Sequence, residues 1–178
     1  MGKRIRAWLK SFSTAAMAVA QLSLAPTMAA PAPKDAPAPR DAREQAPAGL
    51  IGLWKADFSA STFAGAKPQA LVRSFAYSED GKILVNFWTL GTSGNLVAGH
   101  WAAQVDGTPA IEYHSSTGSI AFNVVSLKKI DDTSLALTVT RHGKVDIEAT
   151  YKLSPDAKTL TYSYGGNTIV YRPWNFQS

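Results

Sequence analysis

The chain of 178 residues contains no cysteine. This absence excludes disulfides, thiolate metal sites, cysteine nucleophiles and a lipid-modified N-terminal cysteine. Charged residues are scarce, at 17%, and beyond the N-terminal region no stretch is apolar for long enough to span a bilayer. No helical pattern of useful length is present either, which argues against an α/β enzyme fold. Any folded domain must therefore be stabilised by the packing of its core alone.

The formal net charge of +5 has a local origin. Four of the 18 basic residues lie within residues 1–10, and no acidic residue occurs before residue 30, so the remainder carries 14 basic and 13 acidic residues. A surface that binds nucleic acid needs a basic patch that neutralises phosphates. The sequence shows no such patch, and we predict no nucleic-acid partner.

Residues 1–29 have the pattern of a secretory signal peptide. A basic segment precedes small apolar residues over 11–25, and Thr27 and Ala29 stand at the −3 and −1 positions of a cleavage site. The alternative is a membrane anchor, but the apolar run is shorter than the ~20 residues that a span needs. We therefore expect cleavage, no membrane span in the mature protein, and a periplasmic or secreted location.

Residues 30–48 alternate alanine, proline and balanced charges. Proline disrupts both helices and sheet ladders, and nothing here can form a core, which is typical of a disordered, extended linker. A role as a proline-rich peptide ligand is the alternative. The folded domain is then predicted to cover residues 49–178.

That domain reads as short strands separated by turns, because runs rich in Val, Ile, Thr and aromatic residues are bounded by Gly, Asp, Asn, Ser or Pro. Short turns make sequential strands antiparallel neighbours, and closing the sheet removes its exposed edges. We predict an all-β domain, a single antiparallel up-and-down β-barrel of roughly eight to ten strands. A β-sandwich is the alternative, because alternation alone does not separate the two. The predicted strands cover residues 50–58, 69–78, 83–90, 96–105, 110–114, 120–130, 134–141, 144–153, 159–164 and 168–172.

The first predicted strand contains Gly52-Leu53-Trp54. This triplet is similar to the G-x-W signature of lipocalins and their barrel relatives, although the T-D-Y motif of lipocalins is missing. In that group the Trp closes one barrel end and packs against an Arg near the end of the chain. The resemblance implies that Gly52, Trp54 and Arg172 are structural, with Trp54 buried and Arg172 against it. An indole face does attract a guanidinium.

Further motifs recur over residues 50–175, and most of them form turns. They are Trp54-Lys55-x-Asp57, Ser61-x-Phe63, Pro68, Glu79–Lys82, Asp106–Pro109, Lys128–Asp132, Gly143-Lys144 and Ser154–Thr161. In these motifs the chain resembles a family of exported bacterial lipocalin-like small β-barrel domains of unassigned function. The resemblance implies a fold and an exported location, and it supplies no active site.

Catalytic chemistry has little support in the sequence. No G-x-S-x-G elbow occurs. Glu112 and His114 share one face of a strand by its period of two, and the turn at residues 106–109 would bring His100 towards them. This spacing matches no zinc motif. We predict no catalytic residue, metal or cofactor, and retain a hydrolase or isomerase at the barrel mouth, built on these three residues, as the least favoured alternative.

Arg73 is the most suggestive single residue, because it shares a strand face with apolar side chains. Its guanidinium is expected either to point into an apolar space or to extend to the barrel rim. A buried charge needs a partner, which could be Glu112, Asp57 or a bound carboxylate. Trp88 and Trp101, on neighbouring strands, would line a pocket with it or would only fill the core.

We predict a non-enzymatic exported module that binds a small apolar or amphipathic ligand inside the barrel. The predicted ligand-binding residues are Arg73, Phe75, Tyr77, Trp88, His100, Trp101, Glu112 and His114. The alternative is a filled barrel that binds a cell-envelope protein partner through the linker, Trp174 and Phe176. A void of a few hundred Å³ lined by Arg73 and aromatic side chains would favour ligand binding over this alternative.

Overall fold

The structure is a computed structural model that describes residues 41–116 and 119–175. The predicted signal peptide, residues 30–40 of the predicted linker, and Phe176 lie outside the described residues. Across the described ranges, no helix combines the length and the apolar character that crossing a membrane requires.

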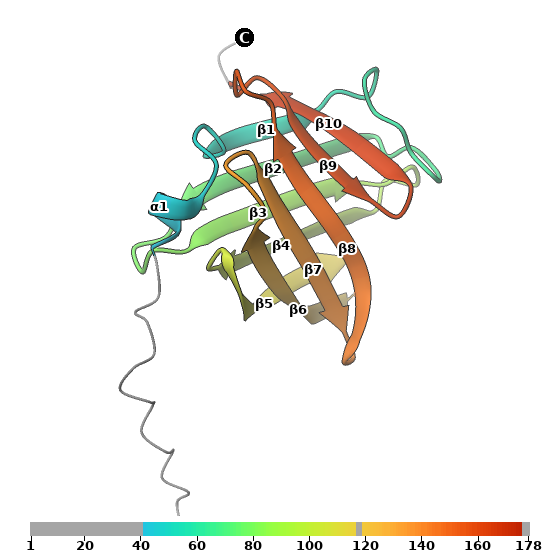
Figure 1. The fold of residues 1–178 in the computed structure, drawn as a ribbon. Helices are drawn as coiled ribbons and strands as arrows, with labels where there is room; N and C mark the ends of the chain where they lie inside the picture. The colour runs from blue at the N-terminus through green and yellow to red at the C-terminus, as the bar shows by residue number, and fades with distance from the viewer. Residues whose placement is uncertain (1–40, 117–118, 176–178) are drawn as a thin grey trace, which may run out of the picture. The chain divides into compact units, whose positions relative to one another are not determined.

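Ten antiparallel strands form a closed β-barrel (Figure 1). Sequential strands pair with one another, and β1 pairs with both β2 and β10, which closes the sheet. The predicted up-and-down barrel is confirmed, and the β-sandwich is not formed. The strands are β1 (Gly52–Ala56), β2 (Ala70–Tyr77), β3 (Ile83–Leu90), β4 (Leu96–Ala103), β5 (Asp106–Ser116), β6 (Ser119–Lys129), β7 (Ser134–Arg141), β8 (Lys144–Leu153), β9 (Leu160–Tyr164) and β10 (Asn167–Pro173).

The strand β5 begins earlier than the sequence predicts. Residues 106–109, predicted as a turn, belong to this strand, and its pairing with β6 shifts in register between Asp106 and Pro109. A bulge of this kind accommodates a proline, which has no N–H to donate to the ladder. The connection between β4 and β5 is therefore only Gln104 and Val105.

Residues 41–48 are ordered, which corrects the predicted disordered linker over this part. The short helix α1 (Ala42–Gln45) is capped by Asp41, whose side chain accepts a 2.8 Å hydrogen bond from the Arg43 N–H. The Ala42 N–H donates to Gly81 O at 2.9 Å, and Arg43 donates to Ser78 O at 3.0 Å. These contacts with the β2–β3 turn, and the complete burial of Ala42, order a segment that its composition does not.

The two ends of the barrel differ in how they are filled. At the end that carries the β2–β3, β4–β5, β6–β7 and β8–β9 turns, apolar side chains are almost wholly buried, and we call it the packed end. Its side chains include Leu50, Ile83, Val105, Leu135, Leu153 and Leu160. The opposite end, under the β1–β2, β3–β4 and β9–β10 connections, contains unfilled space, and we call it the hollow end.

Trp54 is buried as predicted, with 2% of its surface exposed, and its indole N–H donates to Leu50 O at 2.9 Å. Arg172 does not pack on it. Trp54 pairs with Pro173, and Arg172 pairs with Lys55, so alternation places Arg172 on the outer face. There it donates to Asp57 Oδ2 at 3.3 Å. The predicted contact between Trp54 and Arg172 is wrong because the two residues stand one position apart in register.

Gly99 on β4 is expected to tolerate no side chain. A Cβ at this position would lie 2.7 Å from the carbonyl oxygen of Tyr113 and would also meet the Phe87 ring. We expect Gly99→Ala to destabilise the fold by about 1–3 kcal/mol through overpacking, as measured by urea denaturation. Gly65→Ala is the control, since nothing lies within 4 Å of its added Cβ. Equal stability of the two variants would contradict this prediction.

Candidate functional site

Two adjoining hollows occupy the hollow end, and Arg73 lines both of them. The first, about 200 Å³, is the Glu112 hollow, and its lining includes Phe87, Trp101, Glu112 and Tyr162. The second, about 460 Å³, lies beneath the β1–β2 and β3–β4 connections and is called the Phe63 hollow. Its apolar lining includes Phe63, Pro68, Leu71, Ile169 and Tyr171.

Aromatic rings surround the Arg73 guanidinium inside the barrel. The guanidinium carbon lies 4.4 Å from the centre of the Tyr162 ring, 5.5 Å from that of Phe87 and 5.6 Å from that of Tyr151. The Arg73 Nε–H donates to the Tyr171 hydroxyl at 3.3 Å. Ring faces stabilise a desolvated cation, but they do not neutralise its charge.

The charge of Arg73 persists at neutral pH. Burial by itself lowers the pKa of the guanidinium, but Coulombic interaction with Tyr151, Tyr171 and Tyr162 and the hydrogen bond to Tyr171 raise it on balance. An arginine is protonated at neutral pH in any case. Burial also raises the pKa of Tyr151, and it raises that of Tyr162 to about 12, while Arg73 opposes both shifts. Arg73 is therefore a fixed cation among neutral phenols.

These tyrosines predict a loss of stability at alkaline pH. Because the pKa of Tyr162 is about 12 in the folded state and about 10 in an unfolded chain, the unfolded state ionises first. The contribution of the neutral Tyr162 hydroxyl to stability is therefore fully present below about pH 10, and it is lost as the pH rises towards 12. We expect Tyr162→Phe to reduce the fall between about pH 9 and 11 by roughly 1.3 kcal/mol, as measured by urea denaturation at the two pH values. An unchanged fall in the variant would contradict the assignment.

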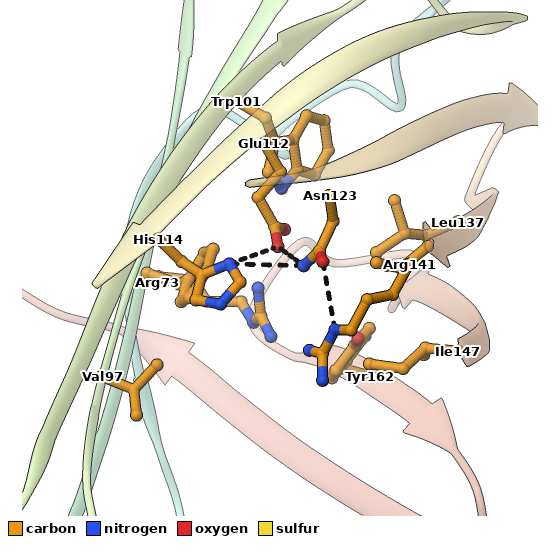
Figure 2. A pocket seen from close by; sticks show the side chains of 12 residues that line it. Arg73, Val97, Trp101, Glu112, His114, Asn123, Leu137, Arg141, Ile147 and Tyr162 are labelled. Carbon is orange, nitrogen blue, oxygen red and sulfur yellow. Dashed lines mark hydrogen bonds and ion pairs between the residues drawn. The ribbon is translucent and has the colours of Figure 1, made fainter. Parts of the chain in front are cut away.

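The polar side of the Glu112 hollow is a hydrogen-bonded network from β5, β6 and β7 (Figure 2). Glu112 is 7% exposed, and its Oε1 accepts from the Asn123 Nδ2–H at 2.7 Å. His114 Nδ1 lies 3.3 Å from the same nitrogen and 3.6 Å from Glu112 Oε1. Arg141 Nε donates to Asn123 Oδ1 at 3.2 Å and pairs with Asp146 at 3.4 Å. Asn123 thus fixes both the acid and the imidazole at the hollow.

Within this network, both partners of the His114 ring lie on Nδ1. Nε2 is the other polar atom of the ring, and it is a donor or an acceptor according to the tautomer. Figure 2 shows His114, Arg73 and Arg141 projecting towards one region of the hollow. A ligand in this hollow could therefore contact two cationic groups, those of Arg73 and Arg141. It could also contact the Glu112 carboxylate, which lies beside the His114 imidazole.

Of the predicted ligand-binding residues, the structure brings four to the Glu112 hollow: Arg73, Trp101, Glu112 and His114. Phe75 is buried in the core and meets the Tyr151 ring edge-on at 5.5 Å. Tyr77 lies at the packed end, with Arg43 5.9 Å from its ring centre. Neither Phe75 nor Tyr77 lines a hollow.

Trp88 and His100 lie on the outer face of the barrel, which corrects the prediction that they join the interior group. His100 pairs with Tyr113, whereas Glu112 and His114 occupy the alternate, inward positions of β5. His100 and Glu112 are therefore separated by the sheet itself. Among the residues in the described ranges, no group of three His, Cys, Asp or Glu could hold a metal ion.

The sequence interpretation missed several residues of the site, among them Asn123, Arg141, Tyr162 and Tyr171. The inward direction of Asn123 could have been predicted from the sequence, since it alternates with Val125 and Leu127 on the inward face of β6. The positions of the two tyrosines could not have been predicted, because their approach to Arg73 depends on which strands face one another across the barrel. Trp174, predicted for a partner surface, lies beside Lys55, whose Nζ is 5.3 Å from its ring centre.

Comparison of the chain with known family models, curated proteins and solved structures found no match. The barrel fold is therefore supported by the structure, whereas the proposed membership of an exported family is supported by the sequence motifs alone.

Proposed function

We propose that this barrel is an exported, non-enzymatic module that binds a small amphipathic molecule with an anionic group, such as a carboxylate. The observation that carries the proposal is the Arg73 guanidinium, which lies inside the barrel at the junction of two hollows. A desolvated charge is costly unless a partner compensates it. A ligand anion would be that partner.

The two carboxylates that the sequence offered to Arg73 have other partners. Glu112 binds Asn123 and lies beside His114. Asp57 lies at the outer face, where Ser59 and Arg172 bind it and lower its pKa. Among the described residues, no acid forms an ion pair with Arg73 within 4.0 Å. Of the three candidate partners, the bound carboxylate is the one these contacts favour.

The shape of the hollows suits an amphipathic ligand. The Phe63 hollow, at about 460 Å³, is within the range of ligand pockets and offers Phe63, Leu71 and Ile169 to an apolar group. The ligand anion would lie at Arg73, where the two hollows adjoin. A hydrogen-bond donor elsewhere on the ligand would reach Glu112 in the other hollow. Unfilled space of this size also weighs against a filled barrel that acts only through its surface.

The test is the displacement of a fluorescent amphipathic anion, anilinonaphthalene sulfonate, from the full chain. We expect the probe to bind and dodecanoate to displace it, whereas dodecanol, which has the same chain without the charge, should displace it more weakly. Native mass spectrometry of protein purified from its own host should show a bound small molecule. A protein that is always ligand-free and binds no probe would contradict the proposal.

A further inference from the structure

We propose that the outer face of the barrel carries a second binding site, specific for a neutral saccharide. A groove of about 300 Å³ crosses β3, β4 and β5 on the outside of the sheet, and we call it the outer groove. Its outward side chains are Asn86, Trp88, Ala98, His100, Tyr113 and Ser115. Gly99 and His114 line the groove as well, and His114 also lines the Glu112 hollow. The proposal for the outer groove does not rest on the proposed function.

The strand register builds the groove. Ala98 pairs with Trp88 on one side and with Ser115 on the other. His100, two residues further along β4, pairs with Asn86 and with Tyr113 in the same way. Trp88 and Tyr113 therefore stand two strands apart and two residues out of line, with about 12 Å between their backbones. Ala98, with its small side chain, lies beside Trp88, and His100 lies beside Tyr113. Two large rings and a low floor give a slot that fits a flat ring.

The walls of the outer groove are aromatic rings in contact with solvent. Trp88 is 40% exposed and Tyr113 is 52% exposed, even though both lie in the middle of well-paired strands. Large aromatic side chains gain free energy when their faces are covered. The C–H faces of a pyranose ring are apolar and flat, so they can cover such rings without a charged partner.

The remaining polar side chains of the groove are hydrogen-bonding groups that suit sugar hydroxyls. Asn86 is held in place, because its Nδ2–H donates to Ser74 Oγ at 3.1 Å. The His100 ring lies against the Tyr113 ring, with 5.9 Å between their centres. Ser115 adds an exposed hydroxyl at the other edge. Amide, imidazole and hydroxyl groups can each donate to and accept from a hydroxyl.

The absence of Lys, Arg, Asp and Glu from this face favours a neutral ligand. In β2, β3 and β4, no Lys, Arg, Asp or Glu occupies an outward position, and the one charged residue in these strands, Arg73, points inward. A face without cations gives no attraction to phosphate, an anionic lipid surface or an acidic polymer. Apolar walls, polar edges and the absence of outward Lys, Arg, Asp and Glu side chains together match a saccharide.

The experiment is isothermal titration of the full chain with three neutral oligosaccharides: cellohexaose, maltohexaose and chitohexaose. We expect at least one to bind, and we expect Trp88→Ala and Tyr113→Ala each to weaken that binding at least about tenfold. Phe122→Ala is the matched control, because Phe122 is exposed and pairs with Tyr113 but does not line the groove. It should bind as the unaltered protein does, and circular dichroism should show all three variants folded.

Several results would overturn the proposal. One is that none of the three oligosaccharides binds at millimolar concentration. Another is that an oligosaccharide binds and both groove variants still bind it. Binding lost in Arg73→Met but kept in Trp88→Ala would place the sugar inside the barrel instead. Trp88-dependent binding of a synthetic proline-rich peptide of residues 31–40, with no sugar bound, would assign the groove to a peptide. Anilinonaphthalene sulfonate binding should be unchanged in both groove variants, which separates this site from the interior one.

Discussion

Replacement of Arg73 by methionine is expected to stabilise the protein and to weaken its binding of anionic amphipathic ligands. Methionine fills a similar volume among Tyr162, Phe87 and Tyr151 without a charge that must leave water. Replacing a buried charge by a well-packed apolar side chain is often stabilising, by about 1–4 kcal/mol. We expect a gain of at least about 1 kcal/mol in urea denaturation, with a matching rise in Tm.

The same variant should bind these ligands more weakly, because a hydrogen bond to a charged group contributes about 1.5–3 kcal/mol, which corresponds to roughly tenfold to a hundredfold in affinity. The affinity for anilinonaphthalene sulfonate and for dodecanoate measures this loss. Arg172→Met is the control, since that arginine is at the surface and pairs with Asp57 outside the barrel. A variant that is strongly destabilised yet keeps its affinity for dodecanoate would show that Arg73 is a structural residue only.

Truncation of Trp54 to alanine is expected to cause a large loss of stability. Its side chain is almost wholly buried in the barrel, and its indole N–H donates to the Leu50 carbonyl. Removing a buried tryptophan costs about 3–5 kcal/mol through lost burial and the cavity that remains. The loss of its hydrogen bond also leaves the buried Leu50 acceptor without this donor. Urea denaturation followed by circular dichroism measures the change.

The matched control for this prediction is Trp88→Ala, the same substitution on the outer face. Surface substitutions of this kind change stability by about 0.5 kcal/mol or less, and Trp88 is 40% exposed. A similar loss in the two variants would contradict the assignment of the inward and outward faces. This pair therefore tests the sheet orientation on which both proposed sites depend.

The strands were the most predictable part of this protein. Strands β3, β7 and β8 begin and end at the predicted residues, because their ends are set by local turn residues such as Gly143, where φ is +75°. The closed barrel followed from the shortness of the connections, which leaves each strand beside its sequence neighbour. The pairing of Glu112 and His114 on one face needed only the period of two.

Predictions that crossed from one strand to another were less successful. His100 was expected near Glu112, but its position on β4 is an outward one in this register. Arg172 missed Trp54 because a single step of register reverses the face of a side chain. The ordering of residues 41–48 was missed for a related reason, since Ala42 is buried by contacts with the β2–β3 turn.

The sequence by itself determined most of the strands, their antiparallel neighbours and the closed barrel, but it left open whether Arg73 points inward or to the barrel rim. These features depend on local alternation and short turns, which a sequence records directly. Only the tertiary structure decided what surrounds Arg73, because the ring of Tyr162 on β9 reaches it across the interior of the barrel. Phe87, in contrast, is its partner on the adjacent strand β3. The tertiary structure likewise decided that one barrel end is packed and the other is hollow, since unfilled space depends on how side chains from many strands meet.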